Sequence, residues 1–269
     1  MRLGEGSLVP LAALGVLGMT GTLARRLRQN PPVPLEEYRK KRRFGVTPEP
    51  KGKTVVRKRV RKLVYVIQKH RATALHYDFR LEWNGVMLSW AVPKGPSLDP
   101  ADKRLAMQVE DHPIEYNKFE GIIPAGEYGG GTVMIWDRGH WLPESPSVDA
   151  ALKKGELKFV LDGEKLHGGF VLVRTGRFGE GRKPSWLLIK HRDEWASKTQ
   201  IVEEQPRSVV SQRLLVEIAR DEGGDMIKAA DGDPPELLRK LVANPKLVRP
   251  KKTSRKKSVW HSNRVKDAS

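Results

Sequence analysis

The stretch LHYDFRLEW, from Leu75 to Trp83, decides the fold class of this chain. Apolar side chains occupy its odd-numbered positions, and polar or charged side chains occupy its even-numbered positions. Because successive side chains of a β-strand point to opposite faces, this strict alternation predicts a strand with one apolar and one polar face. The dipeptide Asn84-Gly85 then predicts a tight hairpin turn, and VMLSWAV, from Val86 to Val92, predicts the returning strand.

Further short strands are predicted on both sides of this hairpin. Each is a run rich in β-branched and aromatic residues, bounded by turn-forming residues. They are LVYVIQKH at 63–70, RLAMQVED at 104–111, TVMIWD at 132–137, LKFVLD at 157–162, FVLVRT at 170–175 and WLLIKH at 186–191. Many short strands at close spacing predict an antiparallel barrel or sandwich. The glycine-rich piece IIPAGEYGGG at 122–131 is expected to be a loop.

The flanks of this strand-rich region differ from it in composition. Residues 1–34 combine an apolar stretch, Ser7–Ala24, with the proline-rich break QNPPVP. That stretch is short for a membrane span and lacks a convincing signal-peptide cleavage site, so we favour a leader that belongs to no domain. Short helices are predicted at 35–44, which is basic, and at roughly 208–219, which is amphipathic. The expected organisation is a leader and linker at 1–34, a folded domain at 35–198, and a helix with a disordered basic tail at 199–269.

Charge is the strongest global property of the chain. Its 269 residues contain 50 Lys and Arg against 32 Asp and Glu, a formal net charge of +18. Such an excess favours a polyanionic partner, with nucleic acid ahead of an acidic membrane surface. The runs KGKTVVRKRVRK at 51–62 and KLVRPKKTSRKK at 246–257 each hold seven basic residues and no acid. Runs of this kind are typical of arms that follow a phosphate backbone, and a membrane partner is not expected.

The polar face of the 75–83 strand predicts a metal site. The chain has no cysteine, so any metal must be held by His, Asp and Glu. His76 and Asp78 point to the same side of their strand, and His70 ends the preceding strand. Two imidazoles and one carboxylate leave open positions for water or a phosphate oxygen, and Arg80 adds a fork of donors on the same face. The His-x-Asp pattern with a distant His also resembles the facial triad of non-haem iron oxygenases, which is the rival enzyme reading.

Several separated motifs resemble one known family. They are LEEYRKKRRFGVTPEP at 35–50, QKHRATALHYDFRLEWNGVMLSWAVPKGPS at 68–97, EDHPIEY at 110–116, EGIIPAGEYGGGTVMIWD at 120–137, GGFVLVR at 168–174 and WLLIKHRD at 186–193. In this order they resemble the 3′-phosphoesterase domain of bacterial DNA ligase D. The resemblance covers most of the region from 35 to 195. It implies a mainly β fold, a small antiparallel β-barrel with a few short flanking helices.

The resemblance also implies roles for individual residues. A manganese site, with other divalent metals as alternatives, is expected on His70, His76 and Asp78. Catalytic positions are expected at Gln68, Arg80, Arg104, His112 and Tyr116, and phosphate or substrate contacts at Arg42, Glu49 and Lys94. His112 is expected to donate a proton to the leaving oxygen or to stabilise a phosphorane. Arg43 departs from the family pattern, which usually has an acidic or amide residue at this position.

The implied activity is trimming of nucleic-acid 3′ ends. A 3′-terminal ribonucleotide is removed first, and the remaining 3′-phosphate is then removed, which prepares broken DNA ends for ligation. Expected partners are DNA or RNA–DNA 3′ ends and a separate ligase, polymerase or end-binding protein, in the cytoplasm at the nucleoid. The segments at 208–219 and 259–264 resemble linker sequence and no nucleotidyl-transferase lysine motif follows, which favours a stand-alone form that does not seal nicks. A non-catalytic nucleic-acid-binding barrel remains the alternative.

Overall fold

The computed structural model describes residues 35–52, 62–176 and 184–243, which belong to one compact unit. The predicted leader at 1–34, most of the basic run at 51–62, and both the basic run at 246–257 and the segment at 259–264 lie outside the described residues. In the three described ranges no helix is long and apolar enough to cross a membrane.

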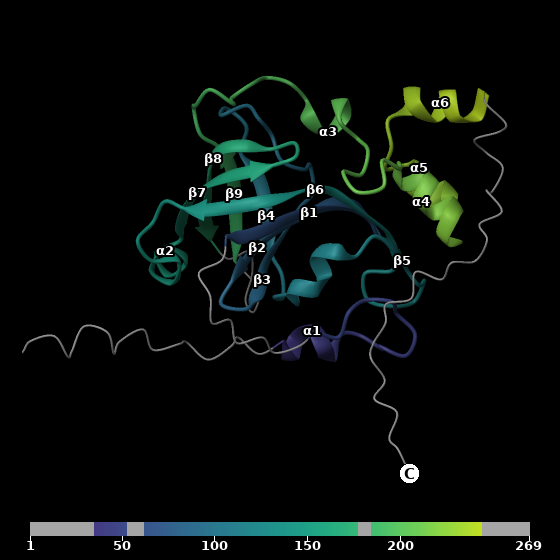
Figure 1. Ribbon diagram of the computed structural model, residues 1–269, viewed down its shortest axis with the longest axis horizontal. Coiled ribbons are helices and arrows are strands. Elements are labelled where there is room, and N and C mark those ends of the chain that lie inside the picture. Colours follow the sequence, from purple (N-terminus) through teal and green to yellow (C-terminus); the bar gives the residue numbers. More distant parts are fainter. Residues whose placement is uncertain (1–34, 53–61, 177–183, 244–269) are drawn as a thin grey trace, which may run out of the picture. The chain divides into compact units, whose positions relative to one another are not determined.

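One antiparallel sheet forms the centre of the structure. Its strands are β1 Leu63–Arg71, β2 Leu75–Trp83, β3 Val86–Val92, β4 Arg104–Gln108, β5 Gly121–Ile123, β6 Gly131–Pro143, β7 Glu156–Gly163, β8 His167–Gly176 and β9 Ser185–Lys190. Their spatial order is β1-β2-β3-β4-β9-β8-β7-β6-β5, and β1 also pairs with β6 (Figure 1). This second pairing closes eight strands into a barrel and leaves β5 outside the ring. The predicted antiparallel barrel is confirmed.

The β2–β3 hairpin has the predicted bounds and anchors the barrel core. Asn84 and Gly85 form its turn with φ angles of 49° and 84°, the left-handed conformation that an Asn-Gly turn adopts. The odd-numbered residues of β2 point into the barrel, where Phe79 stacks on Phe159 with ring centroids 5.7 Å apart. Fully buried tryptophans complete this interior, namely Trp90, Trp136 and Trp186. Because aromatic side chains fill the barrel, it has no room for a site within it.

The even-numbered residues of β2 lie on the outer face of the barrel, and this face is covered. Asp78, Arg80 and Glu82 are all buried. The cover includes the 3₁₀ helix η1 (Ile114–Lys118), since Gln68 on β1 donates to the backbone carbonyls of Tyr116 and Phe119. A solvated strand face would not bury charged groups in this way, so the polar layer needs partners of its own.

The N-terminal helix is shorter than the 35–44 prediction. Helix α1 spans Glu36–Lys40 and lies below the strands in Figure 1. The chain leaves the helix because Arg42 folds its guanidinium back onto the carbonyl of Tyr38, at 3.1 Å, and Arg43 opens a turn that the N–H of Val46 closes at 2.8 Å. Side-chain bonds to helix-end carbonyls satisfy acceptors that another helical turn would otherwise use.

The predicted loop at 122–131 is wrong at its first two residues and at its last, since Gly131 begins β6. Ile122 and Ile123 belong to β5, which pairs with the start of β6 through Ile122 opposite Thr132. Two β-branched residues beside an open strand edge favour this pairing. The remaining residues, from Pro124 to Gly130, form the expected loop.

The region after residue 198 holds more helix than predicted. Among the described residues, four helices follow the barrel, namely α3 (Ile201–Glu204), α4 (Leu215–Glu222), α5 (Met226–Ala230) and α6 (Pro235–Ala243). One more helix, α2 (Val148–Lys154), lies between β6 and β7. The predicted helix at 208–219 is wrong in its first half, because Gln212 has a φ of 60° and the Ser208 hydroxyl accepts two turn N–H groups. The prediction of a disordered tail directly after one helix is likewise wrong for residues 220–243.

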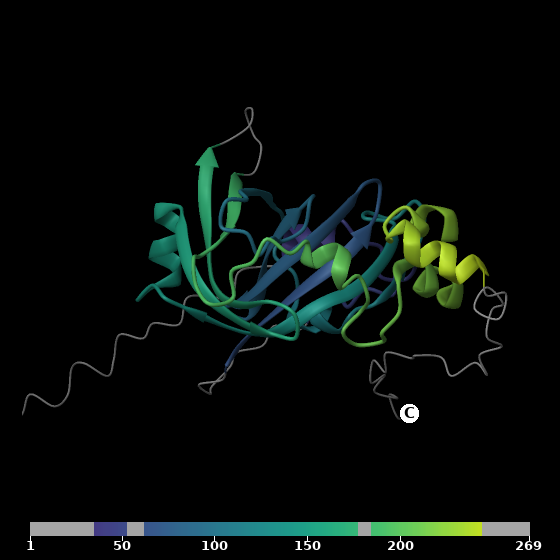
Figure 2. The same ribbon diagram turned by 90° about the horizontal axis from the view of Figure 1, so that it is seen from above.

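A buried ion pair joins these helices to the barrel. The Lys69 ammonium of β1 lies 3.7 Å from the Asp233 carboxylate, and both side chains are almost fully buried. Asp233 also accepts the backbone N–H groups of Leu215 and Val216, which begin α4. Asp233 therefore caps one helix and neutralises a lysine of the barrel at once. Figure 2 shows α4, α5 and α6, coloured green to yellow, gathered beyond one end of the strands.

Candidate functional site

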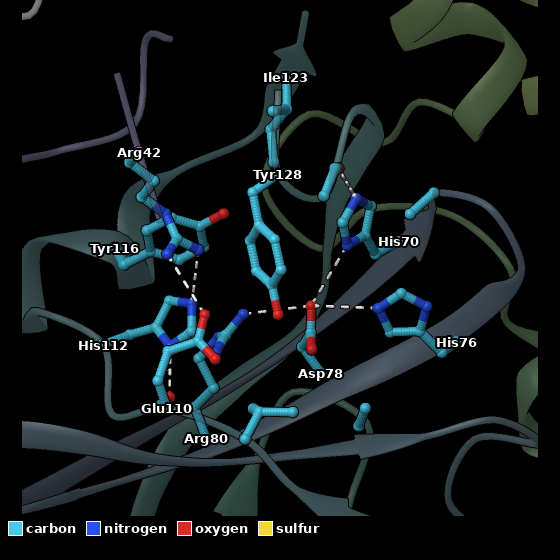
Figure 3. Close-up of a pocket in the computed structure, with 14 residues that line it drawn as sticks. Arg42, His70, His76, Asp78, Arg80, Glu110, His112, Tyr116, Ile123 and Tyr128 are labelled. Atoms are coloured by element: carbon cyan, nitrogen blue, oxygen red, sulfur yellow. Dashed lines mark hydrogen bonds and ion pairs between the residues drawn. The ribbon is translucent and has the colours of Figure 1, made fainter. Parts of the chain in front are cut away.

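A pocket opens on the outer face of the barrel, where the even-numbered residues of β2 meet three covering segments (Figure 3). Its lining combines titratable side chains with a few small and apolar ones. The lining residues are Arg42, His70, Ala72, His76, Asp78, Arg80, Ala91, Val109, Glu110, His112, Tyr116, Ile123, Tyr128 and Gly129.

The strand register brings the three predicted metal ligands together. His70 of β1 lies directly opposite His76 of β2, and Asp78 follows two residues along the same face. The Oδ2 atom of Asp78 is 3.5 Å from Nδ1 of His70 and 3.7 Å from Nε2 of His76. Within the described ranges these three side chains form the only group of His and acidic ligands close enough to hold a metal ion, with one ligand atom of each inside 4.8 Å of the others.

Backbone carbonyls fix the two imidazoles in orientations suited to metal binding. His70 donates from Nε2 to the carbonyl of Gly129 at 2.8 Å, and His76 donates from Nδ1 to the carbonyl of Ala74 at 3.0 Å. The tautomers follow from these partners, since a carbonyl only accepts. In the neutral imidazoles, Nδ1 of His70 and Nε2 of His76 therefore carry the lone pairs, and both atoms face Asp78, to which they donate hydrogen bonds only when protonated. A second hydrogen bond of this kind is the usual companion of a metal-binding histidine.

The charge balance keeps Asp78 ionised. Burial opposes its ionisation, but the Arg80 guanidinium, with Nη2 at 3.1 Å, and the two imidazoles outweigh that effect and hold the pKa of Asp78 well below its usual value. For His76 burial also acts against the charged form, but the hydrogen bond and charge of Asp78 prevail and raise its pKa. A cation at this site would therefore meet a carboxylate that is already deprotonated.

The donor set suits a divalent transition metal. Two imidazole nitrogens and one carboxylate oxygen are ligands that manganese, zinc and iron accept. Ligand atoms at about 2.1 Å from a metal lie about 3 Å apart when adjacent, so the observed separations require only a small contraction. Three protein ligands leave positions open for substrate or water, as catalytic sites do. The residues present therefore fit the predicted metal.

Arg80 is held from three sides, and this explains the place of Gln68. Its guanidinium donates to Gln68 Oε1 at 3.0 Å and to the Ser89 hydroxyl at 2.9 Å, and its third nitrogen faces Asp78. Gln68 is fully buried and does not line the pocket. It connects Arg80 to the backbone of η1, so its geometry is that of a positioning residue behind the pocket wall.

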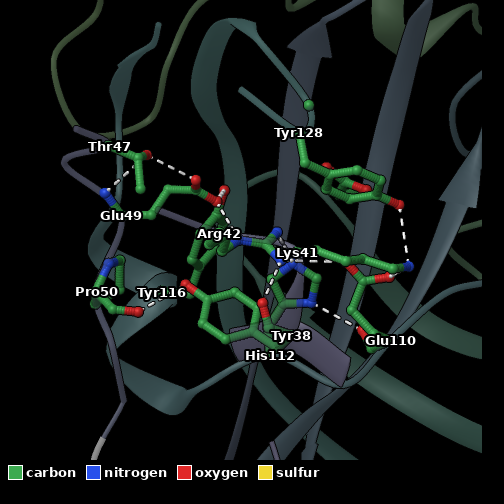
Figure 4. A network of polar contacts seen from close by, with 12 residues as sticks. Tyr38, Lys41, Arg42, Thr47, Glu49, Pro50, Glu110, His112, Tyr116 and Tyr128 are labelled. Atoms are coloured by element: carbon green, nitrogen blue, oxygen red, sulfur yellow. Dashed lines mark hydrogen bonds and ion pairs between the residues drawn. The ribbon is translucent and has the colours of Figure 1, made fainter. Parts of the chain in front are cut away.

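Arg42 is the centre of a second network on the opposite wall (Figure 4). Its guanidinium stacks on the Tyr38 ring at 3.9 Å and donates to Glu49 Oε1 at 2.7 Å and to Glu110 Oε1 at 3.3 Å. Glu49 does not line the pocket. Its carboxylate accepts hydrogen bonds from the Arg42 guanidinium, the Thr47 hydroxyl and the Tyr116 hydroxyl. The predicted residues Arg42 and Glu49 thus form one unit, in which Glu49 sets the direction of Arg42.

His112 is neutral in this arrangement. Its Nδ1 donates to the Glu110 carbonyl at 2.9 Å, which leaves Nε2 as an acceptor 3.2 Å from Nη2 of Arg42. Burial, and then the positive charges of Arg80 and Arg42, hold the pKa of His112 well below its usual value. The predicted proton donor is therefore unprotonated at Nε2 until negative charge arrives in the pocket.

Tyr116 lines the pocket as a neutral phenol. Burial, reinforced by the carboxylate of Glu49, raises the pKa of Tyr116 well above its usual value. Its hydroxyl donates to Glu49 Oε1 at 3.1 Å, and the Arg80 guanidinium lies 5.0 Å from its ring centroid. The side chain thereby contacts both networks at the floor of the pocket.

Arg104 and Lys94 do not reach the pocket. Arg104 begins β4 and shares a strand face with Ala106, which is buried in the barrel core, and its Nη2 pairs with Asp102 at 2.7 Å. Lys94 lies in the turn after β3, in an exposed position. Seven of the predicted site residues line the pocket, and Gln68 and Glu49 lie behind its wall. Arg104 and Lys94 lie apart from it.

Sequence reasoning missed several residues of the site. Glu110 orients both Arg42 and His112, and Lys41 and Tyr128 meet at the rim, where Lys41 donates to the Tyr128 hydroxyl at 3.3 Å. Glu110 carried a usable signal, since it stands two residues before His112 in EDHPIEY. Lys41 and Tyr128 gave no such signal in the sequence, because their contact depends on how a loop packs against the N-terminal segment.

Comparisons with known proteins agree with the geometry. A family model described as the DNA Ligase D 3′-phosphoesterase domain matches residues 68–174. Over 186 residues the chain is 50% identical to the multifunctional non-homologous end joining protein LigD of Pseudomonas aeruginosa, which covers 68% of this chain and 22% of that protein. It is 41% identical over 165 residues to the protein of the same name from Mycolicibacterium smegmatis, covering 60% of this chain and 21% of that protein.

A third relative is the multifunctional non-homologous end joining DNA repair protein LigD of Mycobacterium tuberculosis, 43% identical over 166 residues. That match covers 58% of this chain and 20% of that protein. The chain thus spans about a fifth of the length of the curated relatives it matches.

Proposed function

Residues 68–174 of this chain belong to the DNA ligase D 3′-phosphoesterase domain family, and on that premise we propose that the protein is a metal-dependent phosphoesterase that trims the 3′ ends of nucleic acid. The single observation that carries the proposal is the convergence of two opposed sets of groups on one pocket. His70, His76 and Asp78 form one set, and Arg42 and His112 face it from the other wall. A phosphoryl group needs both, a cation on its non-bridging oxygens and donors around it.

The metal would be held by His70, His76 and Asp78. When bound, it supplies a Lewis acid that polarises the phosphoryl group and neutralises charge on its oxygens. Manganese is the metal we propose, with other divalent ions as alternatives, because a mixed nitrogen and oxygen donor set suits it. Arg80 keeps Asp78 ionised and aligned, so its role at the metal is to position a ligand.

The protein's own residues would handle the phosphate and the leaving group. Arg42 directs one nitrogen into the pocket beside His112 and offers it to a phosphate oxygen. A phosphate placed there adds negative charge beside His112, which opposes the effect of the two arginines and raises the pKa of His112. Substrate binding would therefore prepare the proton at Nε2 that the leaving oxygen requires, without a charged imidazole in the free protein.

Two successive reactions fit this site. The first hydrolyses the last phosphodiester, releases the 3′-terminal ribonucleoside with a 5′-hydroxyl and leaves a 3′-phosphate. The second hydrolyses that phosphate to leave a 3′-hydroxyl and inorganic phosphate. Both place a phosphoryl group at the same position between the metal ligands and Arg42, so one pocket serves both. The partners we propose are DNA or RNA–DNA 3′ ends, with a separate ligase, polymerase or end-binding protein to use the product.

The proposal is tested with a primer–template that carries a single 3′-terminal ribonucleotide, incubated with Mn²⁺ and resolved for shortened products. We expect trimming by the full chain and its loss in His76→Ala. The matched control is His140→Ala, which removes an exposed histidine of β6 far from the pocket lining. Unchanged trimming in His76→Ala would refute the metal assignment.

The rival readings give different outcomes in the same experiment. An iron oxygenase would require Fe²⁺ and 2-oxoglutarate and would leave the primer unchanged with Mn²⁺. A non-catalytic barrel would bind the primer–template and release no product with any metal. Arg42, which faces the three ligands, favours the phosphoesterase over the oxygenase, because it supplies a phosphate site that an oxygenase does not need. The three converging ligands favour the phosphoesterase over a non-catalytic barrel, which needs no metal.

A further inference from the structure

Tyr128 stands at the mouth of the pocket as a large aromatic side chain that is half exposed. It lines the pocket together with Ile123 and Gly129 of the same segment, and 48% of its surface remains accessible. Figure 3 shows its ring above Asp78, between Arg42 and His70. An exposed ring at the entrance to a charged pocket offers an aromatic surface to a ligand that binds there.

The loop that carries Tyr128 is held in one conformation. The N–H of Glu127 bonds the carbonyl of Pro124 at 3.2 Å, and the N–H of Gly130 bonds the carbonyl of Glu127 at 2.9 Å. Gly130 admits no side chain, because a Cβ would lie 2.7 Å from the oxygen of Pro124. Two tight turns and a position that only glycine tolerates leave the loop little freedom.

Contacts on both sides of Tyr128 tie this loop to the rest of the site. On one side Glu127 forms a two-pronged ion pair with Arg43. On the other side the Gly129 carbonyl accepts the Nε2 hydrogen of His70. The ring is therefore presented at a fixed distance from the metal ligands, and ordering it on binding costs little conformational entropy.

Two cations lie over the ring. The Lys41 ammonium is 4.7 Å from the ring centroid and the Arg42 guanidinium 5.5 Å from it. Lys41 is itself fixed, since it pairs with Glu110 at 3.0 Å and with Glu37 at 3.1 Å. An aromatic surface next to fixed cations is the combination that proteins use for nucleotide strands, where bases stack and phosphates are paired.

We propose that the Tyr128 ring is the stacking surface for the nucleobase of the 3′-terminal nucleotide. The proposal rests on the proposed function, because it takes the terminal phosphate as bound between Arg42 and the metal ligands. It makes Tyr128 a specificity-determining residue that separates a nucleotide end from an abasic end or from free phosphate. Since every base has a π face, the preference does not depend on base identity.

The test uses an oligonucleotide whose 3′ end carries a phosphonomethyl group, in which carbon replaces the bridging oxygen so that it is not hydrolysed. Binding to the Mn²⁺-loaded full chain is compared for a terminal base and for a terminal abasic site. We expect Tyr128→Ala to weaken binding of the base-bearing end by about tenfold or more, the range of one base–aromatic stack. Tyr128→Phe keeps the ring and should bind within about twofold of the unaltered chain.

Fluorescence of the terminal base distinguishes stacking on Tyr128 from a merely structural role of this residue. With 2-aminopurine as the terminal base, its fluorescence should be quenched on binding to the unaltered chain and to Tyr128→Phe, and not to Tyr128→Ala. The abasic end should bind equally to all three. Equal losses for both ends in Tyr128→Ala, or no quenching by the unaltered chain, would overturn the proposal.

The two proposals fail in distinguishable ways. Trimming of a 3′-ribonucleotide without quenching removes the stacking role and leaves the phosphoesterase intact. Quenching that is lost in Tyr128→Ala, in a chain that releases no product with Mn²⁺, removes the phosphoesterase and leaves a nucleotide-binding surface.

Discussion

The carbonyl oxygen of Gly129 lies 2.8 Å from Nε2 of His70. This single contact joins the glycine-rich loop to a proposed metal ligand, because it sets the tautomer of His70 and points Nδ1 toward Asp78. The position of a backbone atom in a loop is thereby part of the proposed metal site.

Gly129→Ala should weaken metal binding. Gly129 has a φ of 76°, a conformation that alanine adopts only with strain, so the substitution should shift the carbonyl away from His70. We expect Mn²⁺ affinity to fall about tenfold, the usual scale for loss of a partner behind a ligand, as measured by calorimetric titration. Gly126→Ala is the matched control, since Gly126 has a φ of 85° in the same loop and nothing lies within 4 Å of its added Cβ. Equal losses in both variants would show that loop strain alone, and not the carbonyl, is responsible.

The Arg43–Glu127 ion pair predicts that an acidic residue is unfavourable at position 43 in this chain. Arg43→Asp would place a carboxylate against Glu127, whose own side chain is nearly buried, and should displace the loop. We expect the rate of 3′-phosphate release to fall by about fivefold or less, which is the scale of an exposed ion pair. The double variant Arg43→Asp with Glu127→Lys reverses the pair and should restore the rate.

Lys40→Asp serves as the control for this test. Lys40 is exposed on α1, and its replacement changes the net charge by the same amount without removing the partner of Glu127. A higher rate in Arg43→Asp than in the unaltered chain would contradict the role of Glu127 in holding the loop.

His112 predicts a pH dependence of stability. Because burial and the two arginines lower the pKa of His112 in the folded protein, the unfolded chain binds a proton that the folded chain does not once the pH falls below about 6.5. Stability should therefore decrease as the pH falls from 7 to 5, with His112 contributing up to about 1.4 kcal/mol per pH unit. In His112→Asn the free energy of unfolding, taken from urea titrations, should show a shallower slope over this window. His140→Asn controls for the loss of any histidine, and an unchanged slope in His112→Asn would contradict the prediction.

The Lys69–Asp233 pair predicts an asymmetry between its two partners. Asp233→Ala leaves a buried ammonium without its counter-charge and uncaps α4, so the free energy of unfolding should fall by about 3–5 kcal/mol. Lys69→Met should cost less, because Asp233 keeps its two backbone N–H donors and methionine fills the space of the lysine stem. Urea unfolding of the two variants measures the difference. A larger loss in Lys69→Met would reverse this account.

Local sequence pattern was sufficient to place His70, His76 and Asp78 on one face and to predict the strands that carry them. The alternation along Leu75–Trp83 and the Asn84-Gly85 turn gave the bounds of β2 and β3, and the register of the hairpin followed from the turn. His70, His76 and Asp78 then shared a face by geometry alone. These are properties of neighbouring residues, which a single sequence contains.

The covering layer was not predictable in the same way. Arg42, Glu110 and Tyr128 come from three segments without regular periodicity, and they meet only because the barrel brings those segments to one face. Arg104 was predicted at the site and does not lie there. In its strand, β4, the larger apolar side chains face solvent and not the core. Leu105 and Met107 are exposed while Arg104 shares a face with buried Ala106, so the apolar residues do not mark the core.

From Leu75 to Leu81 on β2, residues that pack in the barrel core and residues that line the pocket alternate one by one. The two sets are separated by the sheet itself, so mutation can change one set without disturbing the packing of the other. Substitutions at positions 76, 78 and 80 can thus be selected for new chemical properties while the aromatic interior maintains the fold. For the same reason a designer could graft a different metal-binding triad onto this strand and judge it on chemistry alone.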